Sequence, residues 1–172
     1  AKSVIFGIVY GISGYGLMDN LHITKKEAEY FINKYYEMYP EVKEYMAREI
    51  EFARENGYVK TMFNRKRVID EINNKNFMIR QSGERMAINT PIQGTAADIM
   101  KMAMIKIAEV FEKENIQSKM ILQVHDELIF DVKNEELEKI KTLVKDVMEN
   151  ITPLNVPLKS SSDVGTNWYD IK

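Results

Sequence analysis

Residues 119–132 hold two apolar runs on either side of a short polar segment, Gln123-Val-His125-Asp126-Glu127. Runs of this length that are rich in branched and aromatic side chains are typical of β-strands. Both faces of each run are largely apolar, which predicts strands that are central in a sheet and covered. We expect the chain to reverse at His125 and Asp126, because both residue types tolerate unusual backbone angles.

The acid at the tip of this hairpin has two interpretations. If the strands are buried, the hairpin holds Asp126 rigidly against a cationic group. Alternatively, the tip is a solvated turn with incidental charges, because buried ionised groups are unfavourable and most acids face water. The choice between them depends on the rest of the chain.

The composition fits a globular protein and argues against several classes. The chain has 172 residues, 45% of them hydrophobic and 29% charged, enough for one domain with a real core or for a domain and a half. The net charge of −2 gives no overall basic field, although it leaves room for local basic patches. The absence of cysteine excludes disulfides and cysteine-based metal sites and suits a reducing compartment. The sequence has no apolar run of membrane-spanning length, and we expect no signal peptide at its start.

Periodicity and capping signals predict a mostly helical chain. The expected helices cover residues 1–10, 24–39, 40–56, 74–89, 95–114 and 134–151. Gly14 and Gly16 predict a loop over residues 12–20, and Pro91 should break or bend the chain between the fourth and fifth helices. Asn134 is expected to cap the last helix. The remaining expected strands are a short basic hairpin over residues 58–69, turning near Asn64, and a last strand over residues 156–161.

Two sets of residues recur at the spacing i, i+4, i+8, which places each set on one helix face. The sets are Lys2, Phe6 and Tyr10, and Arg85, Asn89 and Gln93. The first set puts one cation and two rings together, although an amphipathic helix that buries two aromatics is the plainer interpretation. The second set presents hydrogen-bond donors, although such residues can also simply bond one another.

The hairpin over residues 58–69 carries four cations, Lys60, Arg65, Lys66 and Arg67. A basic hairpin is often only a solvated sheet edge. The same charges would also suit a phosphate backbone.

Three stretches, in this order, resemble family A DNA polymerases of the bacterial DNA polymerase I type. Lys2-xxx-Phe6-xxx-Tyr10-Gly11 looks like the later part of their motif B, on the fingers helix that meets the incoming nucleotide. Residues 85–98 are similar to the stretch after the fingers, and Gln123-Val-His125-Asp126-Glu127 looks like motif C. The order and spacing match the family, so coincidence is very improbable.

The resemblance implies an α+β fold in two parts. Residues 1–77 would be a helical fingers subdomain that begins inside the motif B helix. Residues 78–172 would be the C-terminal part of the palm with motif C, in which a β-hairpin and a C-terminal strand pack on helices. Because the chain opens at Ala1 in an apolar stretch with no N-cap, we expect a cut inside a larger protein. Motif A, with the other catalytic aspartate, and the thumb would then precede it as missing segments of the same polypeptide.

The activity implied by the resemblance is template-directed DNA synthesis. The parent protein would be a DNA-directed DNA polymerase, a nucleotidyltransferase of DNA replication and repair, acting in the bacterial cytoplasm at the nucleoid. Its partners would be primer-template DNA and deoxynucleoside triphosphates, and it would not bind a membrane. Its cofactor would be Mg²⁺, with two ions in the complete active site. Without motif A, the fragment alone is predicted to be inactive.

The resemblance also implies roles for residues of the catalytic centre. Asp126 would be a catalytic metal ligand, and Glu127 a weaker metal candidate, because successive strand residues point to opposite faces. Lys2 would serve catalysis by holding the triphosphate, Phe6 would lie beside the base and sugar, and Tyr10 would fill the template-base position before the fingers close.

The remaining implied roles concern DNA. Arg65 and Arg67 would grip the duplex backbone, and His125 would lie by the primer end. The donors expected at the minor groove, whose acceptors are common to all base pairs, are Arg85, Asn89 and Gln93. Ile5 and Asn64 depart from the residues that many family members carry at these positions, Asn and Gly.

Two other functions fit parts of the sequence. One is a non-catalytic duplex-binding module that uses the basic hairpin. The other is a small metal hydrolase built on His125, Asp126 and Glu127, which is weaker because three adjacent residues cannot easily converge on one ion. Binding of DNA without any nucleotide preference would favour the duplex-binding module.

Overall fold

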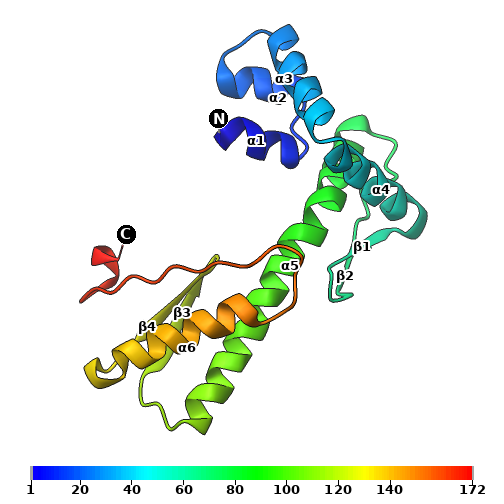
Figure 1. Cartoon of the computed structure of the whole chain (residues 1–172). Coiled ribbons are helices and arrows are strands. Elements are labelled where there is room, and N and C mark those ends of the chain that lie inside the picture. The colour runs from blue at the N-terminus through cyan, green and yellow to red at the C-terminus, as the bar shows by residue number, and fades with distance from the viewer. Residues whose placement is uncertain (1, 172) are drawn as a thin grey trace. The chain divides into compact units, whose positions relative to one another are not determined.

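The computed structural model describes residues 2–171, without the side chains of Lys2 and Ser3. It is mostly helical with two small antiparallel sheets, so the expected α+β class is confirmed (Figure 1). The chain forms two compact units, Ala1–Thr95 and Ala96–Lys172, and their boundary falls inside helix α5 (Phe77–Lys113). The proposed subdomain boundary between residues 77 and 78 stays a prediction.

The first unit opens with four helices, three of which match the predictions. They are α1 (Lys2–Val9), α2 (Gly14–Leu21), α3 (Lys25–Met38) and α4 (Pro40–Asn56). Helix α3 begins at the expected capping box, in which Thr24 and Glu27 exchange backbone and side-chain hydrogen bonds. These bonds hold the pKa of the Glu27 carboxyl below its usual value. Helix α4 ends at Gly57, whose φ of 75° is the left-handed conformation that glycine adopts at no steric cost.

Helix α2 corrects the expectation of a loop over residues 12–20. Its two glycines cost about 1 kcal/mol each in helix propensity. Against this, Ser13 caps the helix by accepting a hydrogen bond from the N–H of Gly16 over 3.1 Å. Leu17 is also buried to 1% exposure. Capping and burial together offset the low propensity.

Helix α5 corrects a second expectation, because it runs through Pro91 without ending. Proline has no N–H, so the carbonyl of Ala87 loses its helical donor. Thr95 donates a hydrogen bond from Oγ1 to the Pro91 carbonyl over 2.5 Å and accepts one from the N–H of Met62 over 2.9 Å. These contacts from outside the helix backbone support the turn that contains the proline.

The basic hairpin has the predicted form. Strands β1 (Tyr58–Lys60) and β2 (Lys66–Val68) pair antiparallel, and Asn64 in the turn has a φ of 64°. Val59 and Ile69 enter the core of the first unit. The buried residues of that core are Ala53, Val59, Ile69, Ile72 and Ala87.

The second unit packs a hairpin against two helices. Strands β3 (Lys119–Val124) and β4 (Glu127–Asp131) pair antiparallel, and the chain reverses as predicted at His125, with a φ of 53°. Helix α6 (Leu137–Asn150) follows a 3₁₀ turn, η1 (Asn134–Glu136). Ile140 of α6 packs with Ile107 and Phe111 of α5, and Leu128 and Phe130 of β4 cover them. A last 3₁₀ turn, η2, spans Trp168–Asp170.

Three expectations for the second unit are wrong. The strands are not covered on both faces, since Ile121 is 59% exposed and Leu122 43% exposed. Asn134 does not cap α6, because the intervening 3₁₀ turn moves the start of that helix to Leu137. Residues 156–161 form no strand in the described chain. Pro157 has no N–H for a ladder, and the N–H of Ser160 donates to Glu149 Oε1 over 2.8 Å instead.

None of the helices within residues 2–171 has the length and apolar character to cross a bilayer.

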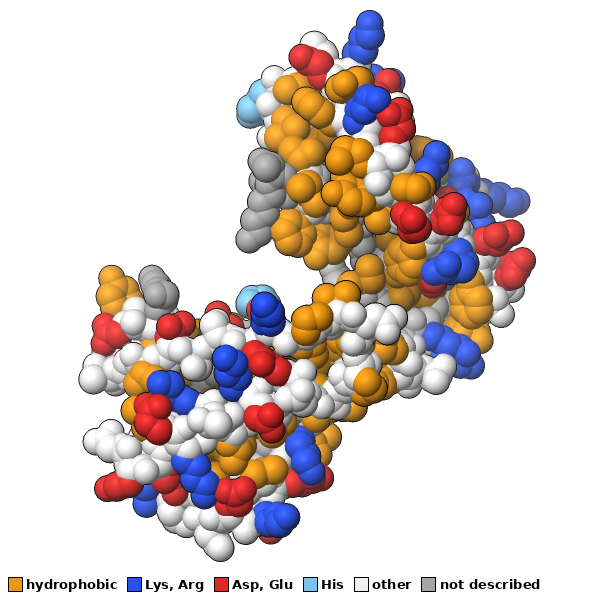
Figure 2. Space-filling model, in the orientation of Figure 1, with side chains coloured by type: hydrophobic (Ala, Val, Ile, Leu, Met, Phe, Trp, Pro, Cys, Tyr) orange, Lys and Arg blue, Asp and Glu red, His pale blue; other side chains and the backbone are white. Residues whose placement is uncertain are grey.

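Exposed apolar side chains gather over the helices of the first unit on the face in Figure 2.

Candidate active site

The exposed rings of Phe6 and Tyr10 stand next to each other on α1. Their centroids are 6.0 Å apart with the ring planes inclined at 35°, as the spacing i, i+4 predicts. Ile8 turns to the other side of the helix and is buried to 2% exposure. The interpretation in which α1 buries both aromatics does not hold in this structure. The Lys2 side chain, the third member of this predicted face, lies outside the described part of the chain.

The end of α1 lies against α5. A Cβ at Gly11, which has a φ of 75°, would lie in ordinary van der Waals contact with α5, 3.4 Å from Arg85 Cγ and 3.5 Å from Ile88 Cδ1. Asn89 donates from Nδ2 to the Tyr10 carbonyl over 3.5 Å. The Asn89 Oδ1 is buried and, within the described residues, has no hydrogen-bond partner. The backbone at the end of α1, at Tyr10 and Gly11, is therefore in direct contact with this part of α5.

Tyr45 on α4 supports the same part of α5. Its hydroxyl donates to the carbonyl of Ile88 over 3.1 Å. Burial raises the pKa of Tyr45 to about 12, so the hydroxyl can donate this bond in alkaline as well as in neutral solution. Sequence reasoning missed Tyr45, because nothing local to it indicates a partner 43 positions away.

Arg85, Asn89 and Gln93 share one helix, as the spacing requires, and the proline between the last two does not separate them. Arg85 and Gln93 are exposed, and Asn89 is half-buried. Two donors therefore face solvent and the middle one contacts the end of α1. This corrects the expectation that the helix ends before Gln93.

The two hairpin arginines bind α5. Arg67 donates from Nη1 to Thr90 Oγ1 over 3.2 Å and from Nη2 to the sulfur of Met86 over 3.4 Å. Arg65 donates from Nη2 to the carbonyl of Gly94 over 3.0 Å.

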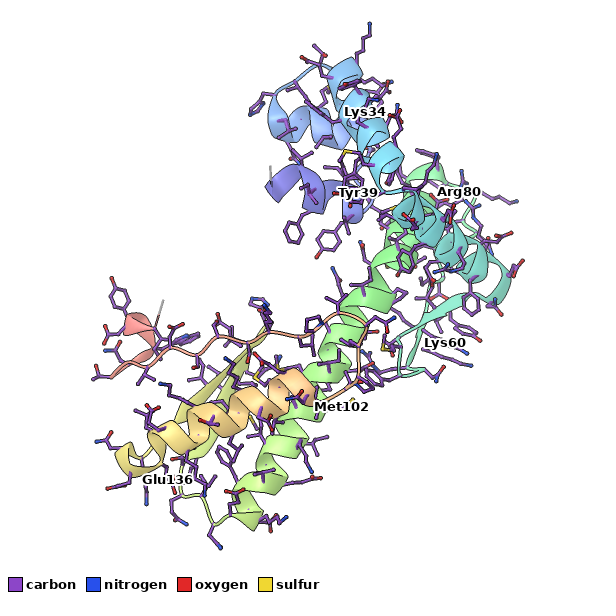
Figure 3. The ribbon with its side chains drawn as sticks, in the orientation of Figure 1. Lys34, Tyr39, Lys60, Arg80, Met102 and Glu136 are labelled. Atoms are coloured by element: carbon purple, nitrogen blue, oxygen red, sulfur yellow. The ribbon has the colours of Figure 1, made fainter. Side chains whose placement is uncertain are left out.

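The two hairpin lysines behave differently. Lys60 on β1 (Figure 3) and Lys66 lie over the Tyr58 ring, with their ammonium nitrogens 5.7 and 4.5 Å from its centroid. Both are cation–π contacts on the hairpin itself.

The tip of the second hairpin presents His125, Asp126 and Glu127, all exposed. The left-handed turn at His125 is held by Gln123, whose Nε2 donates to the His125 carbonyl over 2.8 Å. Glu127 pairs with Val124 as the first residue of β4, whereas Asp126 lies in the turn itself. The solvated interpretation of this tip describes the exposure of these side chains correctly.

The carboxylates at this tip fit magnesium in kind, because Mg²⁺ prefers hard oxygen ligands. They do not fit in number. Within residues 2–171, no group of three or more His, Asp or Glu side chains could hold a metal ion.

Comparison with known proteins decides the family. The model of DNA polymerase family A matches residues 1–170. The chain belongs to DNA polymerase family A.

Relatives within the family are similar over the whole chain. All 172 residues align at 54% identity with a DNA polymerase I of Caldicellulosiruptor bescii and at 51% with one of Bacillus subtilis. Each alignment covers 100% of this chain and 20% of the relative, so the chain spans about a fifth of the length of these relatives.

A solved structure shows the same fold. It is the POL domain of Pol1 from M. smegmatis in complex with DNA primer-template and dNTP. The identity is 39% and the TM-score 0.89, over 92% of this chain and 28% of that chain. The resemblance drawn from the three motifs is thus confirmed at the level of family and fold.

Proposed function

We propose that the protein containing this chain is a DNA-directed DNA polymerase that extends a primer 3′ end by nucleotidyl transfer. The observation that carries the proposal is the connection between two surfaces in the first unit. An exposed pair of rings, Phe6 and Tyr10, is joined through the Tyr10 carbonyl to Asn89. Membership of the family and the DNA and dNTP present in the mycobacterial complex support it.

The residues on α1 would bind the incoming nucleotide. Phe6 offers a flat apolar wall to base and sugar, and Tyr10 a ring that stacks in place of a template base. Lys2 would contribute a compact positive charge to the triphosphate. Because the rings are already side by side and exposed, they require little rearrangement before they meet a base.

The exposed donors on α5 would contact the minor groove. Its acceptors, purine N3 and pyrimidine O2, occur in every base pair, so a degenerate readout accepts all correct pairs. An amide nitrogen has two N–H groups, so Asn89 can hold the Tyr10 carbonyl with one and meet a base with the other. Arg85 and Gln93 flank it along the helix.

Asp126, with Glu127 as a secondary candidate, would hold magnesium at the hairpin tip, and His125 would contact the primer end. Bound magnesium would activate the primer hydroxyl and neutralise charge on the phosphate oxygens. Ligands from outside the described residues must complete the two-metal site. We place the protein in the bacterial cytoplasm at the nucleoid, where its DNA substrate lies.

Primer extension with all four deoxynucleotides and magnesium tests the proposal. The polymerase that contains this chain should extend the primer. The isolated 172-residue chain should not, because its described residues supply too few metal ligands. Extension by the isolated chain would contradict the incomplete-site argument.

The second candidate function is a non-catalytic duplex-binding module, which the cations of the 58–69 hairpin would favour. Duplex affinity measured with and without the correct next nucleotide separates the two. A polymerase should bind primer-template more tightly when that nucleotide is present, whereas a simple duplex binder should not respond. An unchanged affinity, together with no extension by the containing protein, would select the binding module.

A further inference from the structure

The loop of the β1–β2 hairpin is attached to one turn of α5. The contacts come from three loop residues, Thr61, Met62 and Arg65, and from Arg67 on β2. On α5 they reach Thr90, Gly94 and Thr95. Pro91 lies inside this same turn, so the hairpin supports the helix where its own hydrogen bonding is interrupted.

The approach is close enough to require glycine. A Cβ at Gly94 would lie 2.7 Å from Thr61 Cγ2, a distance that real Cβ contacts do not show. Thr61 is itself fixed, since it is buried to 5% exposure and its Oγ1 accepts a hydrogen bond from the N–H of Arg65 over 3.2 Å. The hairpin loop and the α5 turn are therefore fitted to each other.

The face of α5 that the hairpin holds is offset by one residue from the face proposed to contact DNA. Thr90 and Gly94 follow Asn89 and Gln93, and one residue corresponds to about 100° around a helix. The hairpin contacts to Thr90 and Gly94 therefore fix the direction in which Asn89 and Gln93 point around the helix axis.

We propose that Arg67, assisted by Arg65, is a positioning residue that sets the rotation of α5 and so aims Asn89 and Gln93. The alternative is the expectation that both arginines bind the duplex backbone. Arg67 donates hydrogen bonds to Thr90 and Met86, and Arg65 donates one to the Gly94 carbonyl, all on α5. The inference rests on the proposed minor-groove role of Asn89 and Gln93.

Three variants of the containing polymerase separate positioning from phosphate binding. Arg67→Lys keeps the charge but loses the planar fork that reaches both Thr90 and Met86. Thr90→Val removes the acceptor without changing any charge. Lys66→Gln is the matched control, because it removes a neighbouring cation that lies over Tyr58.

The decisive measurement is kcat/KM for extension of a matched primer end relative to a mismatched one. Arg67→Lys and Thr90→Val should each lower this ratio by about tenfold, as expected for one lost hydrogen bond to a charged group. The double variant should lose no more than Arg67→Lys alone, because that variant already removes the bond to Thr90. Lys66→Gln should keep the wild-type ratio.

A phosphate contact would give the opposite pattern. Arg67→Lys and Thr90→Val would then retain normal discrimination. Arg67→Gln would reduce the slope of log affinity against log salt by about one. That result would overturn the positioning role.

Amide hydrogen exchange over residues 87–95 tests the inference independently of activity. Arg67→Lys and Thr90→Val should accelerate exchange there, while Lys66→Gln should not, and unchanged exchange in the first two would overturn the inference. Asn89→Ala in the extension assay distinguishes the two proposals. If it leaves discrimination intact while Arg67→Lys still speeds exchange, then the minor-groove role has failed and the hairpin grip has not. Thermal melts show that each variant is folded.

Discussion

Asn89 on α5 donates a hydrogen bond to the backbone carbonyl of Tyr10, 79 positions earlier in the sequence. The bond joins the last turn of α1 to the helix face that also carries Arg85 and Gln93. A displacement of either helix must therefore stretch or break this contact.

Asp126→Ala in the containing polymerase should abolish turnover while leaving primer-template affinity nearly unchanged. A magnesium ion held by Asp126 would lower the barrier by several kcal/mol, so a loss of at least about a thousandfold in kcat is expected without it. Affinity depends on many phosphate contacts and should be preserved. Single-turnover extension and equilibrium DNA binding measure the two quantities, with Asp131→Asn as the control at the other end of β4. Near-normal turnover would make Asp126 only a turn residue.

Phe6→Tyr should make the polymerase accept dideoxynucleotides more readily. A phenolic hydroxyl beside the sugar can supply a contact that a sugar without its 3′-hydroxyl lacks. A difference of ~3 kcal/mol corresponds to roughly a hundredfold change in the dideoxy-to-deoxy ratio. Competitive incorporation assays measure this ratio, with Ile5→Val on the same helix as the control. An unchanged ratio would argue against Phe6 facing the sugar.

Gly83→Ala should destabilise the first unit although alanine is the better helix former. A Cβ there would lie 2.9 Å from both the carbonyl carbon of Glu71 and the nitrogen of Ile72, and backbone cannot swing aside. Overpacking of this kind costs about 1–3 kcal/mol, against a gain of about 1 kcal/mol in propensity. Denaturant unfolding measures the difference. The neighbouring Ser82→Ala should stay within about 0.5 kcal/mol of the wild type, and equal effects at both positions would contradict the prediction.

Glu136, at the start of α6 (Figure 3), should make stability depend on acidic pH. Hydrogen bonds from the N–H of Gln117 and from Ser118 lower the pKa of its carboxyl below the usual 4.5. Because the pKa of Glu136 is lower in the folded protein than in the unfolded chain, its carboxylate stabilises the fold fully above about pH 4.5. This stabilisation is lost as the pH falls through the pKa of the folded state.

Thermal melts between pH 7 and pH 3 check the Glu136 prediction. Glu136→Gln should melt lower than the wild type at pH 7, and the gap should close as the wild-type carboxylate becomes protonated. Glu135→Gln, next to it, should leave the pH profile unchanged. A gap that stays constant down to pH 3 would show that the charge of Glu136 is not what matters.

The sequence predicted those features whose causes are local. The capping box at Thr24, the stop at Gly57 and the reversal at His125 each depend on a few neighbouring residues, and all three are present. The adjacent rings of Phe6 and Tyr10 on α1 followed from helical spacing alone. The single helix that carries Arg85, Asn89 and Gln93 did not, because Pro91 was expected to interrupt it. The family followed from three motifs in order.

The features that failed depend on distant residues. Helix α5 passes Pro91 with support from Met62 and Arg65 on the hairpin, and α2 forms because Leu17 finds a core. Residues 156–161 have strand-like composition, but a strand requires a neighbouring partner, and Ser160 bonds to Glu149 instead. Spacing within a sequence does not reveal which residues a segment will meet.

The hairpin loop also has a consequence for amide protection. In most surface loops, backbone N–H groups face water and exchange their hydrogens quickly. Here the N–H groups of Met62 and Arg65 are bonded to the hydroxyls of Thr95 and Thr61. We expect the Met62 amide to exchange on the timescale of α5, to which it is bonded, and the Arg65 amide to be protected by its bond within the loop. The loop should then open only when this turn of α5 opens, so that the two segments lose their order together.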